Sequence, residues 1–294
     1  MKKTTDIKAR QHELISIHIA VLLFGVAGLF GKFLQLQPAM IVFGRTLFAS
    51  IVLLIVLWML KTDLRVKSVR HLLGFFSMGA ILAMHWTSFF YSVQISTVAI
   101  ALLTYSSFPI FVTFLEPFVF DEKIRPTDIV VSLVVFLGLF LIIPEFNLAN
   151  NMTLGVIWGT FSGFTFAILS IMNRKFVTEY SALTVALYQD GFACLLLLPF
   201  VGGRVLTLSF GEWRWLILLG VVFTALAHSL FIRGMRTVKA QLAGMIACLE
   251  PVYGILVALV LLQEIPSARE MVGGVVIIGS IVYATKNANA PDLK

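Results

Sequence analysis

One apolar stretch near the middle of this chain returns, with the same internal spacing, near its end. The first copy, AIALLTYSSFPIFVTFLEPFVFDE, covers residues 99–122, and the second, AGMIACLEPVYGILVALVLLQE, covers residues 243–264. The central prolines, Pro109 and Pro251, lie 142 residues apart (251 − 109), and the acidic residues that end the copies have the same separation (264 − 122). Self-similarity at so long a period indicates a fold built from two copies of one unit.

Each copy consists of apolar runs that are long enough to cross a membrane. Of the 294 residues, 59% are hydrophobic and 13% are charged, and the mean hydropathy is +0.97. A soluble domain of this size cannot cover so much apolar surface with so few charges. Because a helix needs roughly 20 residues to cross about 30 Å of hydrocarbon, the length predicts about ten spans. The runs are far longer than the strands of roughly ten residues in a membrane β-barrel, so that class is disfavoured.

The predicted fold is therefore an all-α polytopic membrane protein with ten transmembrane helices. The expected spans are residues 15–33, 38–60, 71–92, 97–120, 126–144, 153–176, 182–200, 212–232, 238–262 and 267–285. They divide into a first repeat at residues 15–144 and a second at residues 153–285, with tails at residues 1–14 and 286–294. A central cavity is expected where the two repeats meet.

The distribution of Lys and Arg predicts the orientation of these spans. If the N-terminus is cytoplasmic, 17 of the 22 basic residues lie on the inner side, four on the outer side and Arg45 within a span. This positive-inside bias predicts that both termini are cytoplasmic. Since five helices separate equivalent positions, the repeats are expected to be inverted across the membrane. Because most of the basic residues lie in short loops, where they set the orientation, the net charge of +7 does not indicate a nucleic-acid partner, and none is expected.

The chain resembles the EamA group of the drug/metabolite transporter superfamily, over residues 15–285. The resemblance rests on Arg45 with Ala49, on Pro109 followed by the turn Asp121-Glu122, and on LEPVYGILVALVLLQE at residues 249–264. It implies ten helices around a central cavity and secondary transport of amino acids, nucleotide sugars, drugs or other metabolites, often outward. It also implies that the chain has no ATP site, and the sequence contains no G-x-x-x-x-G-K-[ST] motif.

Glu250 is the leading candidate for substrate binding or ion coupling. It lies near the middle of the ninth span, where a charge costs about 2.5–3.5 kcal/mol on insertion scales. Its spacing from Ala243, Ala247 and Gly254 places it on a face of small residues, which is expected to meet a partner helix or a cavity. The alternative interpretation is a protonated carboxyl that ties two helices together.

Asp190, in the seventh span, is a second buried carboxyl of the same kind. Together with Glu250 it is a candidate to bind a coupling proton or to attract a cationic group. Alternatively, the carboxyls pair with Arg45 in the second span, which would offset the cost of burying both charges. For Arg45 itself, a structural tie or snorkelling to the outer boundary is also open.

His85 and Trp86 lie in the third span and are candidates to line the cavity. In the second repeat, His228 is the counterpart of Trp86 (228 − 86 = 142), so both repeats place an imidazole at this level. The alternative for each histidine is a hydrogen bond to a neighbouring helix.

Among the aromatic residues, Tyr105 and Trp158 are further candidates to line the cavity. Most of the 26 phenylalanines are expected to face lipid. Trp158 shares a helical face with Ser162 and Thr165, and this position favours the interior.

Pro109 and Pro251 are hinge candidates. Each proline removes one backbone donor and frees the carbonyl four residues earlier, that of Tyr105 or Ala247. A freed carbonyl is tolerated where it meets protein or a watery cavity. The alternative is a static bend.

The sequence contains no signature of an enzyme. There is no G-x-S-x-G, no H-E-x-x-H and no paired C-x-x-C, and the five histidines do not fall at metal-ligand spacing. We therefore expect no catalytic residue, metal or cofactor, and no disulfide between Cys194 and Cys248.

The predicted function is secondary transport of small organic metabolites, such as amino acids, out of the cell across the inner membrane by alternating access. The expected partners are the metabolite, the bilayer and coupling protons, with a monomer or homodimer as the assembly. Two alternatives stay open: an ion-independent facilitator, and a membrane-embedded enzyme or accessory subunit.

Overall fold

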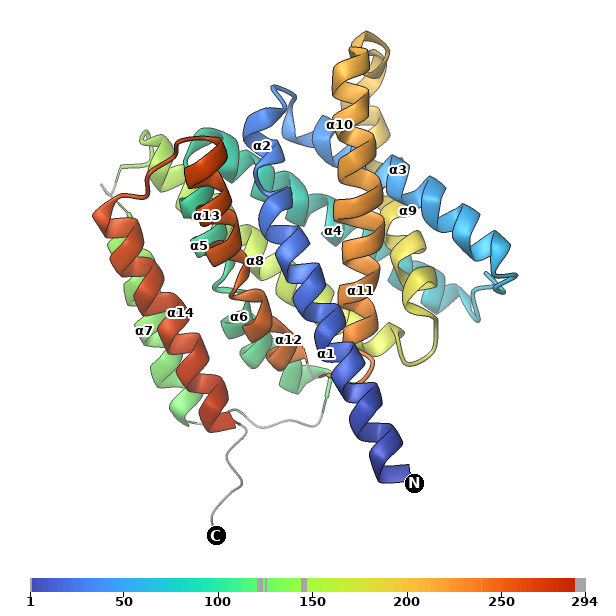
Figure 1. The fold of residues 1–294 in the computed structure, drawn as a ribbon, viewed down its shortest axis with the longest axis horizontal. Helices are drawn as coiled ribbons and strands as arrows, with labels where there is room; N and C mark the ends of the chain where they lie inside the picture. The colour runs from blue at the N-terminus through green and yellow to red at the C-terminus, as the bar shows by residue number, and fades with distance from the viewer. Residues whose placement is uncertain (1, 121–123, 125, 144–146, 239, 289–294) are drawn as a thin grey trace.

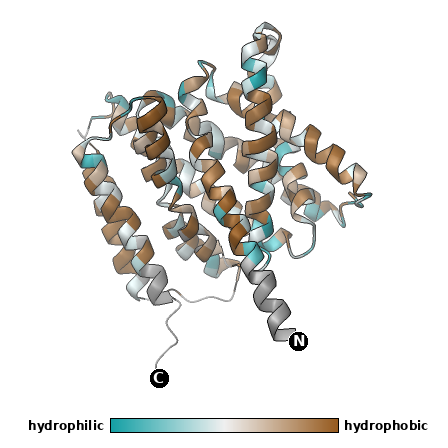
Figure 2. Cartoon of the chain, viewed as in Figure 1, coloured by the Kyte–Doolittle hydropathy of each residue, from teal (hydrophilic) through white to brown (hydrophobic). Residues whose placement is uncertain are grey.

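The computed structural model of the chain describes residues 2–120, 124, 126–143, 147–238 and 240–288. Within these residues every regular element is a helix (Figure 1). Seven helical segments are long and apolar enough to cross a membrane, and 129–142 and 250–261 are shorter apolar helices. Figure 2 shows apolar residues along the bodies of the helices and many of the hydrophilic ones in the connections between them. The predicted all-α polytopic class is confirmed.

The first half contains the spans in the predicted order. Its elements are α1 (Lys2–Ala27), α2 (Phe30–Phe33), α3 (Pro38–Met59), α4 (Val69–Ile95), α5 (Val98–Tyr105), α6 (Phe108–Leu115), the 3-10 turn η1 (Glu116–Phe118) and α7 (Pro126–Ile142). Helix α1 begins at Lys2, so residues expected as a tail before the first span continue it as one helix.

The second half repeats this order. Its elements are α8 (Asn151–Phe176), α9 (Ala182–Val201), the 3-10 turn η2 (Gly202–Thr207), α10 (Phe210–Gly220), the π-helical turn η3 (Val221–Leu226), α11 (Ala227–Gly234), α12 (Ala240–Ala247), α13 (Glu250–Leu261) and α14 (Ala268–Ala288). Local capping residues determine where several of the helices begin. A capping box of Ser209 and Glu212 begins α10, and the Ser68 hydroxyl accepts from the His71 backbone N–H, 3.2 Å away, at the start of α4.

Helix packing follows the internal symmetry. Helix α4 packs on α8, and the equivalent pair from the other half, α11 and α1, also packs. Likewise, α5 and α6 contact α8, while α12 and α13 contact α1. The end of α6 and the end of α13 lie at opposite ends of the bundle, whereas the start of α1 and the end of α14 lie at the same end (Figure 1). This is the inverted arrangement of two five-helix repeats.

The fourth and ninth spans are each broken at the same point of the repeat. Helix α5 gives way to α6 at Ser106–Ser107, and α12 gives way to α13 at Cys248–Leu249 (248 − 106 = 142). Pro109 and Pro251 stand in the first turn of the helix that follows each break. The Ser107 hydroxyl donates to the carbonyl of Thr104, 2.7 Å away, and so satisfies a group at the first break.

Candidate functional site

A cavity lies at the level of these two breaks, between the halves. It is lined by Phe24, Ala27, Gly28, Arg45, Leu82, His85, Trp86, Phe89, Tyr105, Phe166, His228 and Glu250. These residues come from α1, α3, α4, α5, α8, α11 and α13 and from the connection after α1. The cavity measures about 30 Å³, which is room for one or two water molecules. This space is too small for an organic metabolite.

Arg45 is held by three contacts on the cavity wall. Its side chain is buried, Nε donates to Thr224 Oγ1 at 2.8 Å, and one terminal nitrogen donates to the carbonyl of Phe223 at 3.2 Å. The guanidinium carbon lies 3.7 Å from the centroid of the Trp86 ring, a cation–π contact. Among the described residues, neither Asp190 nor Glu250 forms an ion pair with Arg45. Of the alternatives left open by the sequence, an ion pair of Arg45 with either carboxyl is therefore not the one that this structure contains.

The π-helical turn η3 explains this arrangement. Thr224 donates from its hydroxyl to the carbonyl of Leu219, five residues earlier, at 2.8 Å. The wider turn leaves the Phe223 carbonyl available to Arg45. Single π-turns are frequent at functional sites, yet no residue pattern in the sequence announces them. Thr224 was accordingly missed as a site residue.

Glu250 lies at the start of α13, directly after the break, and lines the cavity. It is only 5% exposed, and its Oε2 atom has no hydrogen-bond partner. Ala243, Ala247 and Gly254 are also buried, as the small-residue face predicted. A buried carboxylate oxygen without a partner can accept a bond from a substrate or hold a proton.

Asp190 and His228 lie close together next to the cavity. Asp190 Oδ1 is 3.9 Å from His228 Nδ1, and both side chains are almost fully buried. The His228 ring lines the cavity and makes an edge contact with Trp86, with centroids 5.5 Å apart. Asp190 does not line the cavity, so it stands behind His228 rather than in contact with a bound substrate.

His85 is tied to the sixth span. Its Nδ1 atom lies 2.8 Å from Ser162 Oγ and 3.0 Å from the Ser162 carbonyl oxygen. The ring also packs 4.9 Å from the Phe166 ring and 5.5 Å from the Tyr105 ring, centroid to centroid. The alternative in which a histidine bonds to a neighbouring helix therefore holds for His85. The same side chain also lines the cavity.

Trp158 was predicted to lie in the interior. It lies at the surface instead, so this prediction is wrong. It is 39% exposed and packs edge-on against Tyr91 and Phe161 at the surface. The buried face of α8 is built on Gly155 and Gly159, where α5 and the end of α4 approach too closely for an indole. The large ring is therefore displaced to the outside.

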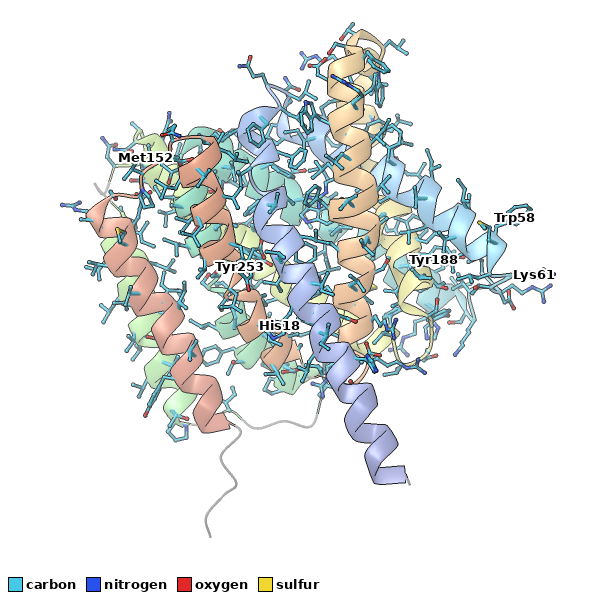
Figure 3. All side chains as sticks on the ribbon, in the orientation of Figure 1. His18, Trp58, Lys61, Met152, Tyr188 and Tyr253 are labelled. Carbon is cyan, nitrogen blue, oxygen red and sulfur yellow. The ribbon has the colours of Figure 1, made fainter. Side chains whose placement is uncertain are left out.

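Several aromatic residues of the wall could not be distinguished in the sequence. Phe24, Phe89 and Phe166 line the cavity, but the sequence offers 26 phenylalanines with no polar marker. Tyr253 of α13 is not among the lining residues and packs against α1 (Figure 3), where a Cβ on Gly25 would be 3.0 Å from its Cβ.

Polar contacts between the halves close both ends of the bundle. At the end that carries α1's start, Glu116 pairs with Arg174, and Arg233 Nε lies 3.2 Å from Glu13 Oε2. Glu116 is buried at this pair although it lies at the end of its span. These contacts join segments far apart in sequence.

At the opposite end, the connection between α13 and α14 holds the start of α5. Glu264 Oε1 accepts from the Val98 backbone N–H at 2.7 Å, and Thr97 Oγ1 donates to Glu270 Oε1 at 2.6 Å. Burial raises the pKa of Glu264, against the opposing effect of the Val98 bond and Lys32.

The inverted helical bundle and its buried polar cavity define a polytopic membrane transporter. The profile of the EamA-like transporter family matches residues 12–143 and 153–285, and the chain belongs to this family.

Similar proteins agree with this assignment. An uncharacterized transporter of Bacillus subtilis, YxxF, is 25% identical over 289 residues, which cover 96% of this chain and 92% of that protein. A Rickettsia conorii S-adenosylmethionine uptake transporter is 29% identical over 263 residues, 86% of each chain. A solved crystal structure with 15% identity superposes with a TM-score of 0.67 over 97% of this chain and 98% of the other, and it shows the same fold.

Proposed function

We propose that the protein is a secondary transporter that exports small organic metabolites, amino acids or related compounds, from the cell across the inner membrane. The observation that carries this proposal is the cavity itself. The guanidinium of Arg45 and the carboxyl of Glu250 lie on the wall of one cavity, and aromatic rings form much of the rest. A compound that carries both a carboxylate and an amine matches the two charged groups at once.

The closed cavity supports alternating access. Its volume of about 30 Å³ does not admit a metabolite, so the halves must separate for substrate to enter. The helix breaks before Pro109 and Pro251 lie at the cavity and are the proposed hinges. In this scheme residues 15–144 and 153–285 form the two moving units, and both termini are cytoplasmic.

A second candidate is uptake of an adenosyl sulfonium compound. The relatives from Rickettsia are named as S-adenosylmethionine uptake transporters. Here Trp86, Phe89 and Tyr105 surround the cavity near Glu250, and aromatic faces with a carboxylate are suited to an onium cation. The two candidate functions differ in the direction of transport and in the ring system that the substrate carries.

The proposal is tested with the full chain in proteoliposomes. A thermal-shift screen of metabolites, including amino acids and S-adenosylmethionine, selects the compounds that stabilise the protein. Counterflow of the labelled hit should exceed that of empty liposomes, and it should be lost in Glu250→Gln. Trp158→Phe, outside the cavity, is the matched control and should transport normally. Absence of any stabilising metabolite and of any counterflow would contradict the proposal.

A further inference from the structure

Asp190 and His228 form a buried pair of titratable side chains whose polar atoms lack hydrogen-bond partners. Asp190, on α9, is 0% exposed, and His228, on α11, is 1% exposed. Both carboxylate oxygens and both ring nitrogens have no hydrogen-bond partner. The 3.9 Å between Oδ1 and Nδ1 is too long for a hydrogen bond. These four buried polar atoms therefore lack the hydrogen bonds that normally offset the cost of burial.

The charges around this pair do not balance. The other charged or titratable groups that face it or the cavity beside it are Arg45, His85, Tyr105, Cys194 and Glu250. Arg45 is the one permanent cation in this set, whereas Asp190 and Glu250 are two carboxyls. With both carboxyls ionised and the histidines neutral, the cluster carries one uncompensated negative charge in the buried interior. One bound proton removes that charge.

The position of each carboxyl indicates where the proton binds. Glu250 lies on the cavity wall, where a cationic substrate group can neutralise it. Asp190 does not line the cavity, whereas His228, whose Nδ1 lies 3.9 Å from Asp190 Oδ1, does, so a substrate group in the cavity meets His228 and not Asp190. The His228 ring touches the cavity on one side and approaches Asp190 through Nδ1, which is the geometry of a proton relay.

We propose that Asp190 and His228 together bind the coupling proton of transport, at a site separate from the substrate carboxylate Glu250. A small movement that closes the 3.9 Å gap lets one proton be shared between Oδ1 and Nδ1. The pair belongs to α9 and α11 of the second half, whereas Arg45 belongs to α3 of the first. Protonation therefore changes the attraction between the halves across the cavity. This inference rests on the proposed secondary transport.

The test of proton binding needs no substrate. Full-length protein in nanodiscs is titrated from about pH 5 to about pH 8, the interval in which histidine changes charge, and infrared difference spectra follow the C=O band of protonated carboxyls. Asp190→Asn should remove one titrating band that Glu250→Gln retains. Retention of all bands in Asp190→Asn, or absence of any titrating band in the wild type, overturns the proposal.

A second variant covers the case in which Asp190→Asn does not fold. His228→Asn keeps the carboxyl and should move the midpoint of the Asp190 band. His85→Asn is the matched control, because the His85 ring is bonded to Ser162 instead, and it should leave that midpoint in place. An unchanged midpoint in His228→Asn overturns the shared site.

Transport assays separate this inference from the proposed function. Asp190→Asn should retain counterflow without a pH gradient but lose the accumulation that a gradient drives in the wild type. Equal wild-type accumulation with and without the gradient overturns proton coupling, as does loss of counterflow in the variant. Absence of counterflow in the wild type contradicts the proposed function itself.

Discussion

Glu264 Oε1 accepts a hydrogen bond from the backbone N–H of Val98, 2.7 Å away, and so joins the second half of the chain to the first. The bond satisfies one of the free donors at the start of α5. Because α5 leads directly to the break beside the cavity, this contact holds the end of the bundle that opens in the proposed alternating-access cycle.

Glu264→Ala should therefore destabilise the closed protein. Loss of a helix-capping acceptor typically lowers the free energy of unfolding by about 1 kcal/mol. Thermal unfolding in detergent should show the decrease. Gln263→Asn is the control, since Gln263 is exposed and its φ of 56° suits asparagine. An unchanged unfolding temperature in Glu264→Ala would mean that the Val98 bond does not stabilise this end.

The same carboxyl predicts a dependence of stability on pH. Burial raises the pKa of Glu264 in the folded protein, so the native state binds more protons at this group than the unfolded state does. Its stabilising contribution is complete below the unfolded pKa of about 4.3 and is lost as pH rises through the folded value. The wild type should thus lose stability relative to Glu264→Gln over this interval. A parallel pH dependence of the two unfolding temperatures would contradict the prediction.

Arg45→Lys should impair transport although the charge is kept. Lysine lacks the planar group that contacts Trp86 at 3.7 Å and bonds Thr224 and Phe223 at the same time. Loss of about 1.4 kcal/mol of interaction corresponds to a tenfold loss of affinity, which counterflow at varied substrate concentration measures. Arg214→Lys is the matched control, because the guanidinium of Arg214 also lies near an aromatic ring, 5.4 Å from that of Phe210, but is exposed. This variant should transport normally. Equal transport by both variants would argue against Arg45 as a site residue.

Helix packing at the breaks predicts a sharp response to added methyl groups. A Cβ on Gly163 would lie 2.7 Å from the carbonyl oxygen of Tyr105, and a Cβ on Gly25 would lie 2.8 Å from that of Glu250. Alanine at either position should lower the free energy of unfolding by about 1–3 kcal/mol, since backbone must move. Gly279→Ala, with nothing within 4 Å, should be neutral or stabilising. Thermal unfolding of the three variants measures these differences, and equal unfolding temperatures would contradict the prediction.

The sequence predicted the spans well because long apolar runs have few ways to fold in a bilayer. Of its candidates, Arg45, Glu250 and His228 line the cavity, since polar groups are rare at that depth and need an inward position. It failed where side-chain geometry decides the outcome. The π-turn that brings Thr224 to Arg45 and the close helix approach that excludes Trp158 depend on neighbouring helices, which periodicity within one span does not encode.

Pro251→Ala tests whether the break between α12 and α13 serves as a hinge. Pro251 stands in the first turn of α13, where proline is well tolerated, so alanine should leave the unfolding temperature almost unchanged. Alanine restores a backbone donor and allows the helix to continue through Cys248 and Leu249, which stiffens the joint. Substrate-induced thermal stabilisation should therefore persist while the rate of counterflow falls. A rate equal to that of the wild type would leave the break as a static bend that shapes the cavity around Glu250.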